Sequence, residues 1–133
     1  MPLKINLKPG EKLFIGGAVI RNDAAAHCEL SILNDVPLLR EKDILSEEGA
    51  DSHCRRIHLC VQLMYMDPAN LGRYQKQYAE LSEELLKAAP STSGHISRIN
   101  ADLATGRYYQ ALKNARQLVD YEQELIQHAQ ETA

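Results

Sequence analysis

The chain has no tryptophan, one phenylalanine and only three cysteines among its 133 residues. Because large aromatic rings are few, a sheet in this chain has few side chains on which single-stranded bases could stack. The cysteines are odd in number and irregularly spaced, which is typical of free thiols in a reduced compartment rather than of a disulfide framework. No apolar run approaches the roughly 18 residues of a membrane span, and no secretory segment opens the chain. We therefore expect a cytoplasmic protein that makes no membrane contact.

The chain also lacks an excess of positive charge, since its net charge is −3. The charges are unevenly distributed. Residues 1–45 carry six basic and six acidic side chains, whereas residues 46–133 carry nine basic and twelve acidic ones. An anionic ligand is therefore expected to meet residues 1–45 rather than the rest of the chain.

Signatures of catalysis and of cofactor binding are missing as well. The sequence has no P-loop, no dinucleotide fingerprint and no nucleophile elbow, and its Gly16-Gly17 pair is typical of a turn. Cys54 and His58 stand four residues apart on a predicted helix, but no second pair completes the four ligands that zinc needs. We predict that the chain is not an enzyme and holds no metal or cofactor.

Residues 1–45 show the alternation of β-strands. Leu3, Ile5 and Leu7 point one way while Lys4, Asn6 and Lys8 point the other. Turn residues separate the segments, and Pro37 favours an edge strand. Five short antiparallel strands are predicted, at residues 3–8, 13–15, 18–20, 27–33 and 36–39.

From residue 46 the apolar spacing becomes helical. Ser46 is the predicted N-cap of the first helix, because Glu47 and Glu48 follow in its first turn. Asp67-Pro68 is predicted to end this helix and begin the next, which Pro90 stops. A short helix around 96–103 and a long one over 108–126 complete the chain. The expected fold is α+β: an antiparallel five-stranded unit at residues 1–45, followed by a four-helix part at residues 46–133.

The basic strand face is the first candidate site. Lys4 and Lys8 project from one face about 13 Å apart, at ~3.3 Å per residue. Lys12, Arg21, Arg40 and Lys42 can join them if the sheet curls. Composition alone favours a solvated face whose edge lysines discourage aggregation. The other interpretation is an RNA surface in which Lys4, Lys8, Arg40 and Lys42 contact phosphates and Arg40 reaches a base.

The segment after Gly106 is the second candidate site. Glycine permits a close approach between two helices, and the tyrosines and alanines that follow suit packing in a tight helical hairpin. Amphipathic helix pairs often offer grooves to other proteins. The candidate protein-partner surface comprises Arg107, Tyr108 and Tyr109.

The motifs together resemble the FlbT family of flagellar biosynthesis repressors, over nearly the whole chain. They are Leu7-Lys8-Pro9-Gly10-Glu11, Pro37-Leu38-Leu39-Arg40-Glu41-Lys42-Asp43-Ile44, Val61-Gln62-Leu63-Met64-Tyr65 and Gly106-Arg107-Tyr108-Tyr109-Gln110-Ala111-Leu112. The resemblance implies post-transcriptional control of flagellin through the 5′ untranslated region of its messenger RNA. It also implies a partner of the FlaF family.

Residues 1–45 are similar, too, to the small translational repressor CsrA, in the order of Gly10-Glu11, Ile15-Gly16 and Arg40-Glu41. That resemblance implies that Lys8 and Arg40 occupy RNA-contacting positions. The chain departs from CsrA at Leu7, where CsrA has a cation, and at Lys8, which replaces an arginine.

Open strand edges in so small a β unit predict a homo-oligomer, because a second copy would cover them. The competing functional class is a protein-binding adaptor or chaperone-like module. Such a module would act through a flagellin-related partner and would make no direct RNA contact.

Overall fold

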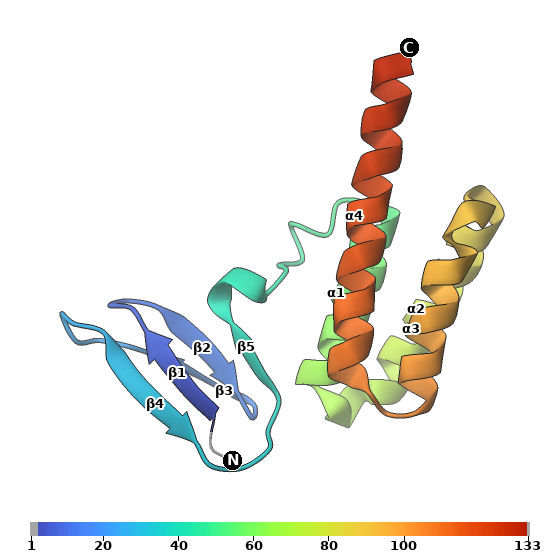
Figure 1. Ribbon diagram of the computed structural model, residues 1–133. Helices are drawn as coiled ribbons and strands as arrows, with labels where there is room; N and C mark the ends of the chain where they lie inside the picture. The colour runs from blue at the N-terminus through green and yellow to red at the C-terminus, as the bar shows by residue number, and fades with distance from the viewer. Residues whose placement is uncertain (1–2, 133) are drawn as a thin grey trace. The chain divides into compact units, whose positions relative to one another are not determined.

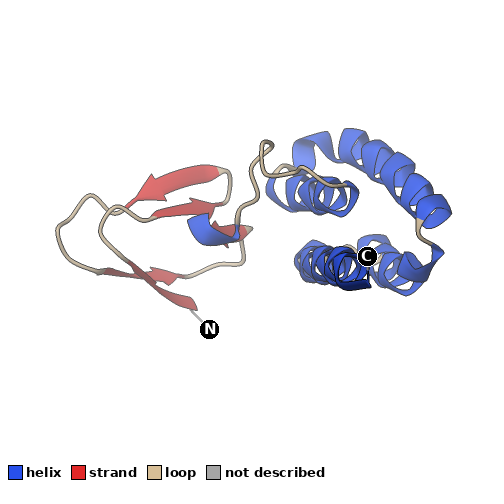
Figure 2. Cartoon of the chain, turned by 90° about the horizontal axis from the view of Figure 1, so that it is seen from above, coloured by secondary structure: helices blue, strands red, loops and turns tan. Residues whose placement is uncertain are grey.

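The computed structural model describes residues 3–132, with five β-strands followed by four α-helices (Figure 1). The strands and the α-helices occupy separate stretches of the chain (Figure 2). The chain divides into two compact units, residues 1–44 and residues 45–133. The predicted α+β class, with five N-terminal strands and four C-terminal helices, is confirmed.

The five strands of the first unit form two small antiparallel sheets rather than one continuous sheet. In the first sheet β1 (Leu3–Leu7) pairs with β4 (Cys28–Ile32). In the second, β2 (Lys12–Ile15) lies between β3 (Ala18–Arg21) and β5 (Leu38–Arg40). β5 is an edge strand, as Pro37 predicted.

A two-residue turn fixes the register of the β2–β3 hairpin. Ile15 pairs with Ala18 across the turn, and Gly16 and Gly17 between them have φ of +55° and +94°. A hairpin loop of this kind needs positive φ at both central positions, which glycine adopts without strain.

The core of the β unit is small and is supplemented by a buried amide. Ile5, Leu7 and Leu13 form its buried cluster. Asn22, 7% exposed, donates from Nδ2 to the carbonyl oxygens of Leu7 at 3.0 Å and Ala26 at 2.9 Å. Its Oδ1 accepts from the amide of Ala24 at 3.0 Å. The sequence placed Asn22 in a loop, and the structure shows that it ties that loop to β1.

The first helix begins later than the sequence predicted. The Ser46 N-cap prediction is wrong, because α1 (His53–Met66) starts after Ser52, whose hydroxyl accepts from the Arg55 amide at 3.1 Å. Ser46 instead accepts from the amide of Gly49 at 3.0 Å within a local turn. Serine side chains compete for nearby amides in this way, and glycine lowers the helical propensity of the segment.

The other helix boundaries follow the sequence closely. Pro68 opens a 3₁₀ turn, η2 (Pro68–Asn70), that leads into α2 (Leu71–Ala88). Pro90 follows the end of α2 and opens η3 (Pro90–Thr92), which is followed by α3 (Ser93–Ala104). The exception is the last helix, α4, which spans Tyr108–Thr132 and so extends beyond its predicted end at residue 126.

The four helices pack around one apolar core. α1 contacts α2 and α4, and α4 also contacts α3. Several core side chains are fully buried: Ile57, Val61, Ile99, Leu112 and Leu118. Gly106, with φ of +72°, closes α3, since its amide bonds the Leu103 carbonyl and the Arg107 amide bonds that of Asp102. This pair of bonds is the glycine-based helix ending that permits the predicted tight hairpin.

Candidate nucleic-acid interface

Lys4 lies on the exposed face of β1, as the alternation predicted. Its Nζ is 3.8 Å from Oε1 of Glu29 on β4. Lys4 is paired with Ser31 and Asn6 with Glu29, so the ion pair is diagonal across the sheet. Exposed pairs of this kind add little stability. The carboxylate nevertheless reduces the positive potential that Lys4 offers to a phosphate.

Lys8 follows β1, which ends at Leu7 rather than at Lys8. Its amide donates to Glu11 Oε1 at 3.0 Å, and its carbonyl accepts from the Glu11 amide at 3.0 Å. The exposed Lys8 ammonium forms no ion pair within residues 3–132. Lys8 is therefore a cation at a fixed turn without a neutralising carboxylate in contact.

Arg40 joins the two sheets. It ends β5 and is half-buried, and its Nη2 donates to the backbone carbonyl of Asn6 on β1 at 2.8 Å. The structure thus brings the candidate arginine to the candidate strand. A guanidinium carries five N–H donors, so one bond to β1 leaves others for a ligand.

Lys42 is exposed in η1 (Glu41–Asp43), the 3₁₀ turn that directly follows Arg40. Its neighbour Glu41 accepts from the Lys12 amide at 3.2 Å, which fixes η1 to β2. Among the described residues the Lys42 ammonium has no ion-pair partner. Lys42 and Arg40 therefore lie on either side of Glu41, whose side chain is bonded to β2.

The second sheet adds two cations opposite each other, since Lys12 on β2 pairs with Arg21 on β3. Arg21 Nε lies 2.5 Å from Asp23 Oδ1, whereas Lys12 has no ion-pair partner in the part of the chain that the structure describes. Like charges directly opposite in a sheet are unfavourable unless a counter-charge is present. Asp23 supplies one such charge, and an anionic ligand would supply another.

The hairpin candidates gather around Tyr109. Arg107 is exposed ahead of α4 and Tyr108 is half-buried, while Tyr109 is 45% exposed. The Tyr109 ring lies 5.5 Å, centroid to centroid, from that of Tyr65 on α1, and Lys113 Nζ lies 5.0 Å from the Tyr109 centroid. Spacing on one helix could have indicated Lys113, but only the packing of α1 against α4 reveals Tyr65.

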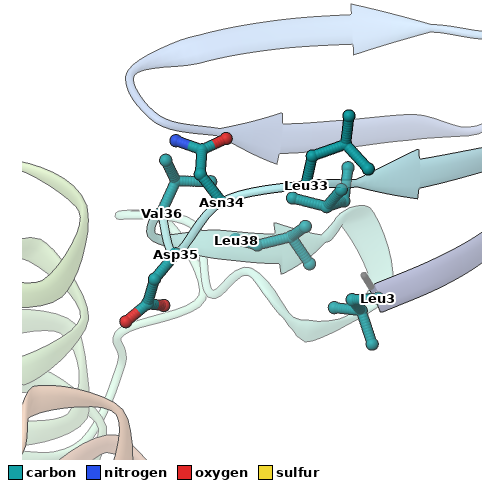
Figure 3. Close-up of a pocket in the computed structure, with 7 residues that line it drawn as sticks. Leu3, Leu33, Asn34, Asp35, Val36 and Leu38 are labelled. Atoms are coloured by element: carbon teal, nitrogen blue, oxygen red, sulfur yellow. The ribbon is translucent and has the colours of Figure 1, made fainter. Parts of the chain in front are cut away.

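An apolar cleft of about 350 Å³ opens in the β unit between the end of β4 and the start of β5 (Figure 3). Its lining residues are Leu3, Ile32, Leu33, Asn34, Asp35, Val36 and Leu38. The side chains of Asn34 and Asp35 point in opposite directions rather than converging (Figure 3). The cleft therefore offers apolar contact without the convergent polar groups of a catalytic or cofactor site.

Sequence comparisons give the family to which these surfaces belong. A family model described as flagellar protein FlbT matches residues 3–126. This chain belongs to the FlbT family. A protein of Rhodopseudomonas palustris (strain TIE-1), named a probable flagellum biosynthesis repressor protein FlbT, is 40% identical over 126 residues, which are 95% of this chain and 98% of the relative. The flagellum biosynthesis repressor protein FlbT of Caulobacter vibrioides (strain ATCC 19089 / CIP 103742 / CB 15) is 32% identical over 130 residues, or 96% of this chain and 92% of the relative.

Membership of the FlbT family confirms the family assigned from the motifs, and with it the prediction of a regulator rather than an enzyme. No solved structure matches the chain. The likeness of residues 1–45 to CsrA therefore stays a prediction.

The buried titratable groups of this FlbT-family chain are unsuited to nucleophilic chemistry. Burial, followed by the nearby Glu122 carboxylate, raises the pKa of the Cys54 thiol to about 12, and burial raises the pKa of Cys60 to about 11. Burial, and then the charge of Arg116, lowers the pKa of His58 to about 4. Both thiols therefore stay protonated and the imidazole stays neutral near pH 7.

Among residues 3–132, no three His, Cys, Asp or Glu side chains lie together as metal ligands would. Within the same residues, no helix has the length and apolar character needed to cross a membrane.

Proposed function

We propose that this chain is a cytoplasmic repressor of flagellum biosynthesis. In this proposal it binds the 5′ untranslated region of flagellin messenger RNA and alters the translation and stability of that message. The names of its relatives support the repressor role. The β unit, residues 1–45 in the proposed division, makes the RNA contact, and the helical part at residues 46–133 serves protein contacts.

The observation that carries the RNA contact is the position of Arg40. Its bond to Asn6 on β1 holds the guanidinium in place before a ligand arrives. Lys8 and Lys42 add cations that have no ion-pair partner within the described residues. A held arginine supplies bidentate contact to a phosphate or a base edge, and lysines supply point charges to phosphates. Lys4 contributes less, because Glu29 shares its charge.

Single-stranded loops are the expected RNA target, because their bases are exposed to a protein. The β unit has one aromatic side chain, and Phe14 is buried in it. Base stacking is therefore weak, and phosphate contacts dominate the binding energy. Binding of this kind falls steeply as salt concentration rises.

A homo-oligomer belongs to the same proposal. Within residues 3–132 the β1–β4 sheet has two strands, so neither of its outer edges is paired with a further strand there. Exposed apolar side chains accompany these edges, among them Leu3 and Leu33. A second copy that covered the edges would hide both the backbone groups and the apolar surface.

The experiment is an equilibrium titration of a fluorescent flagellin leader RNA with the purified full chain at several salt concentrations. The dissociation constant is expected to rise with salt, and Arg40→Ala to weaken binding by at least about tenfold. Arg40→Lys keeps the charge, so its dissociation constant should lie between those of the unmodified chain and of Arg40→Ala. Circular dichroism of each variant controls for folding, because Arg40 also joins the sheets. RNA binding that neither salt nor Arg40→Ala changes would contradict the proposal.

A second candidate function rests on the exposed ring of Tyr109 and its contacts with the half-buried Tyr65 and with Lys113. Tyrosine is enriched at the centres of protein interfaces. In this alternative, Arg107, Tyr108 and Tyr109 dock a flagellin-related or FlaF-family protein, and control of the message is indirect. In this alternative the purified chain does not bind the leader RNA, and Tyr109→Ala abolishes binding of the purified partner. The opposite pattern would remove this alternative.

A further inference from the structure

The last turns of α4 extend beyond the helices that α4 packs against (Figure 1). The first half of α4 is held in the bundle by Ala111, Leu112, Ala115 and Leu118, all fully buried. Glu122 ties the middle of α4 to the start of α1, accepting from the Ser52 hydroxyl at 2.5 Å and from the Cys54 amide at 3.3 Å. Every residue from 123 to 131 is exposed.

The apolar stripe of α4 nevertheless continues past the bundle. Leu125 follows Leu118 by seven residues and Ile126 follows Val119 by seven, so both lie on the face that packs in the first half of the helix. Leu125 is 41% exposed and Ile126 is 45% exposed. The two side chains are neighbours on one helix face and so form a small exposed apolar patch.

The charges of α4 change sign along its length. Residues 104–119 carry Arg107, Lys113 and Arg116 and no acidic residue. Residues 120–132 carry no lysine or arginine and four acidic residues, which are Asp120, Glu122, Glu124 and Glu131. Acidic side chains at a helix C-terminus oppose the helix dipole and cost stability. Of the four acids, Glu131 lies in the last turn. Glu122 is bonded within the chain, whereas Glu124 and Glu131 are exposed and can attract a cationic ligand.

We propose that the acidic end of α4, residues 123–132, is a docking surface for a basic amphipathic helix of a partner protein. Leu125 and Ile126 contact the apolar face of that helix, while Glu124 and Glu131 pair with its lysines or arginines. This is a helix-on-helix recognition mode in which the apolar residues give affinity and the charges give orientation and partner choice. The surface shares no residue with the proposed RNA contacts of the β unit or with the hairpin residues Arg107, Tyr108 and Tyr109.

Charge complementarity selects this occupant over a second copy of the chain. Two copies that paired through this segment would bring acidic residues against acidic residues, with no lysine or arginine in either to offset them. The exposed apolar area is also small, so the contact belongs to the transient, salt-sensitive class of interface.

The test uses the full chain and a defined probe: a synthetic peptide of about 18 residues, roughly five helical turns, with leucine and lysine at amphipathic spacing. One comparison peptide replaces every lysine by glutamate, and another replaces every leucine by alanine. Fluorescence anisotropy gives each dissociation constant. We expect the leucine–lysine peptide to bind at least about tenfold more tightly than either comparison peptide.

Two variants and two matched controls locate the binding. Leu125→Ser/Ile126→Ser and Glu124→Lys/Glu131→Lys should each weaken binding by at least about tenfold. Val19→Ser, which changes an exposed apolar residue of β3, and Glu47→Lys/Glu48→Lys, which reverses two exposed acids ahead of α1, should leave it unchanged.

Three results would overturn the proposal. The first is no preference for the leucine–lysine peptide, and the second is an equal weakening of binding in the control variants. The third is a self-association, seen by sedimentation of the unmodified chain, that Leu125→Ser/Ile126→Ser abolishes. Each result is independent of RNA binding, so failure here would leave the proposed function intact.

Discussion

The two units are stabilised in different ways. Of the nineteen buried apolar residues in the part of the chain that the structure describes, fourteen lie in the helical unit, where helix stripes meet in one core. The β unit has five of them and adds polar ties: Asn22 holds a loop to β1, and Arg40 joins the two sheets. A unit of about 40 residues seldom buries enough apolar surface to be stable without such help.

This difference bears on function, because a residue in the β unit can serve both the fold and a ligand. Arg40 orders β1 and is also the proposed RNA contact. In the helical unit different residues stabilise the fold and contact a ligand, since the buried stripe stabilises the bundle while Tyr109, Leu125 and Ile126 stay exposed. Mutations should therefore separate stability from binding easily in the helices and only with care in the strands.

The largest effect is expected in the helical core. Leu112→Ala removes a fully buried side chain of α4 and should lower the free energy of unfolding by about 3 kcal/mol. Leu125→Ala, on the exposed end of the same helix, should cost less than about 1 kcal/mol. Chemical denaturation followed by far-ultraviolet circular dichroism measures both. Equal decreases would show that the end of α4 is packed, contrary to the structure.

The next largest effect is a loss of stability at low pH, and it also arises in the helical unit. Burial lowers the pKa of His58 to about 4 from an ordinary value of 6.5, and its Nε2 has no hydrogen-bond partner among the described residues. Above pH 6.5 the imidazole is neutral in both the folded and the unfolded states, so its contribution is constant. As pH falls from 6.5 towards 4 the unfolded chain takes up the proton first, and stability falls by up to about 3 kcal/mol.

His58→Leu should remove this part of the acid sensitivity. Denaturation midpoints of the unmodified chain and of His58→Leu, measured between pH 7 and pH 4, test the expectation. Parallel pH profiles for the two proteins would show that His58 is not the group responsible.

A smaller decrease in stability is expected when the side-chain hydrogen bonds of Asn22 in the β unit are removed. Asn22→Ala removes three hydrogen bonds and leaves the carbonyl oxygen of Leu7 without its side-chain donor, at a cost of about 2 kcal/mol. Hydrogen exchange of the amides over residues 7–26 should accelerate, while amides in the helices should be unaffected. Asn34→Ala, at an exposed position, is the matched control. Similar exchange in both variants would mean that Asn22 does not hold the loop.

The thiols offer a comparison between the two units without any mutation. Burial keeps Cys54 and Cys60 protonated, with pKa values of about 12 and about 11. Cys28 on β4 is only half-buried. A thiol-specific reagent at pH 7 should therefore modify Cys28 at least about tenfold faster, because the thiolate is the reactive form. Faster labelling in the helices would indicate that the bundle opens more readily than the β unit.

Local patterns in the sequence were sufficient to predict most of the fold. The alternation from Leu3 to Leu7 fixed β1, the Gly16-Gly17 pair fixed one hairpin, and the proline at position 90 marked the end of α2. Each of these signals acts over a few residues. The start of α1 was misplaced because Ser46 and Ser52 are both plausible caps by sequence, and only the structure shows which serine bonds a helical amide.

The candidate sites were less predictable, because they depend on contacts between distant segments. The sequence placed Lys4 and Arg40 near a shared surface. It did not show that Glu29 pairs with Lys4, or that Arg40 bonds the backbone of β1, since both require strand register. Tyr65 and Tyr109 are far apart in the chain, and their contact follows from the packing of α1 against α4. The division of five strands into two sheets has the same tertiary origin.

The most direct test of the central proposal, that the β unit contacts RNA, compares equal charge reversals in the two units. The measurement is the salt dependence of the dissociation constant for the flagellin leader RNA. The slope is that of the logarithm of the dissociation constant against the logarithm of the salt concentration. Lys8→Glu/Lys42→Glu should lower it by about 1.4, because each phosphate of a single strand that a lysine neutralises contributes about 0.7 to the slope. Lys76→Glu/Lys87→Glu, on α2, should leave the slope unchanged. An equal fall in both variants, or a fall in the α2 variant alone, would contradict an RNA contact made by the β unit.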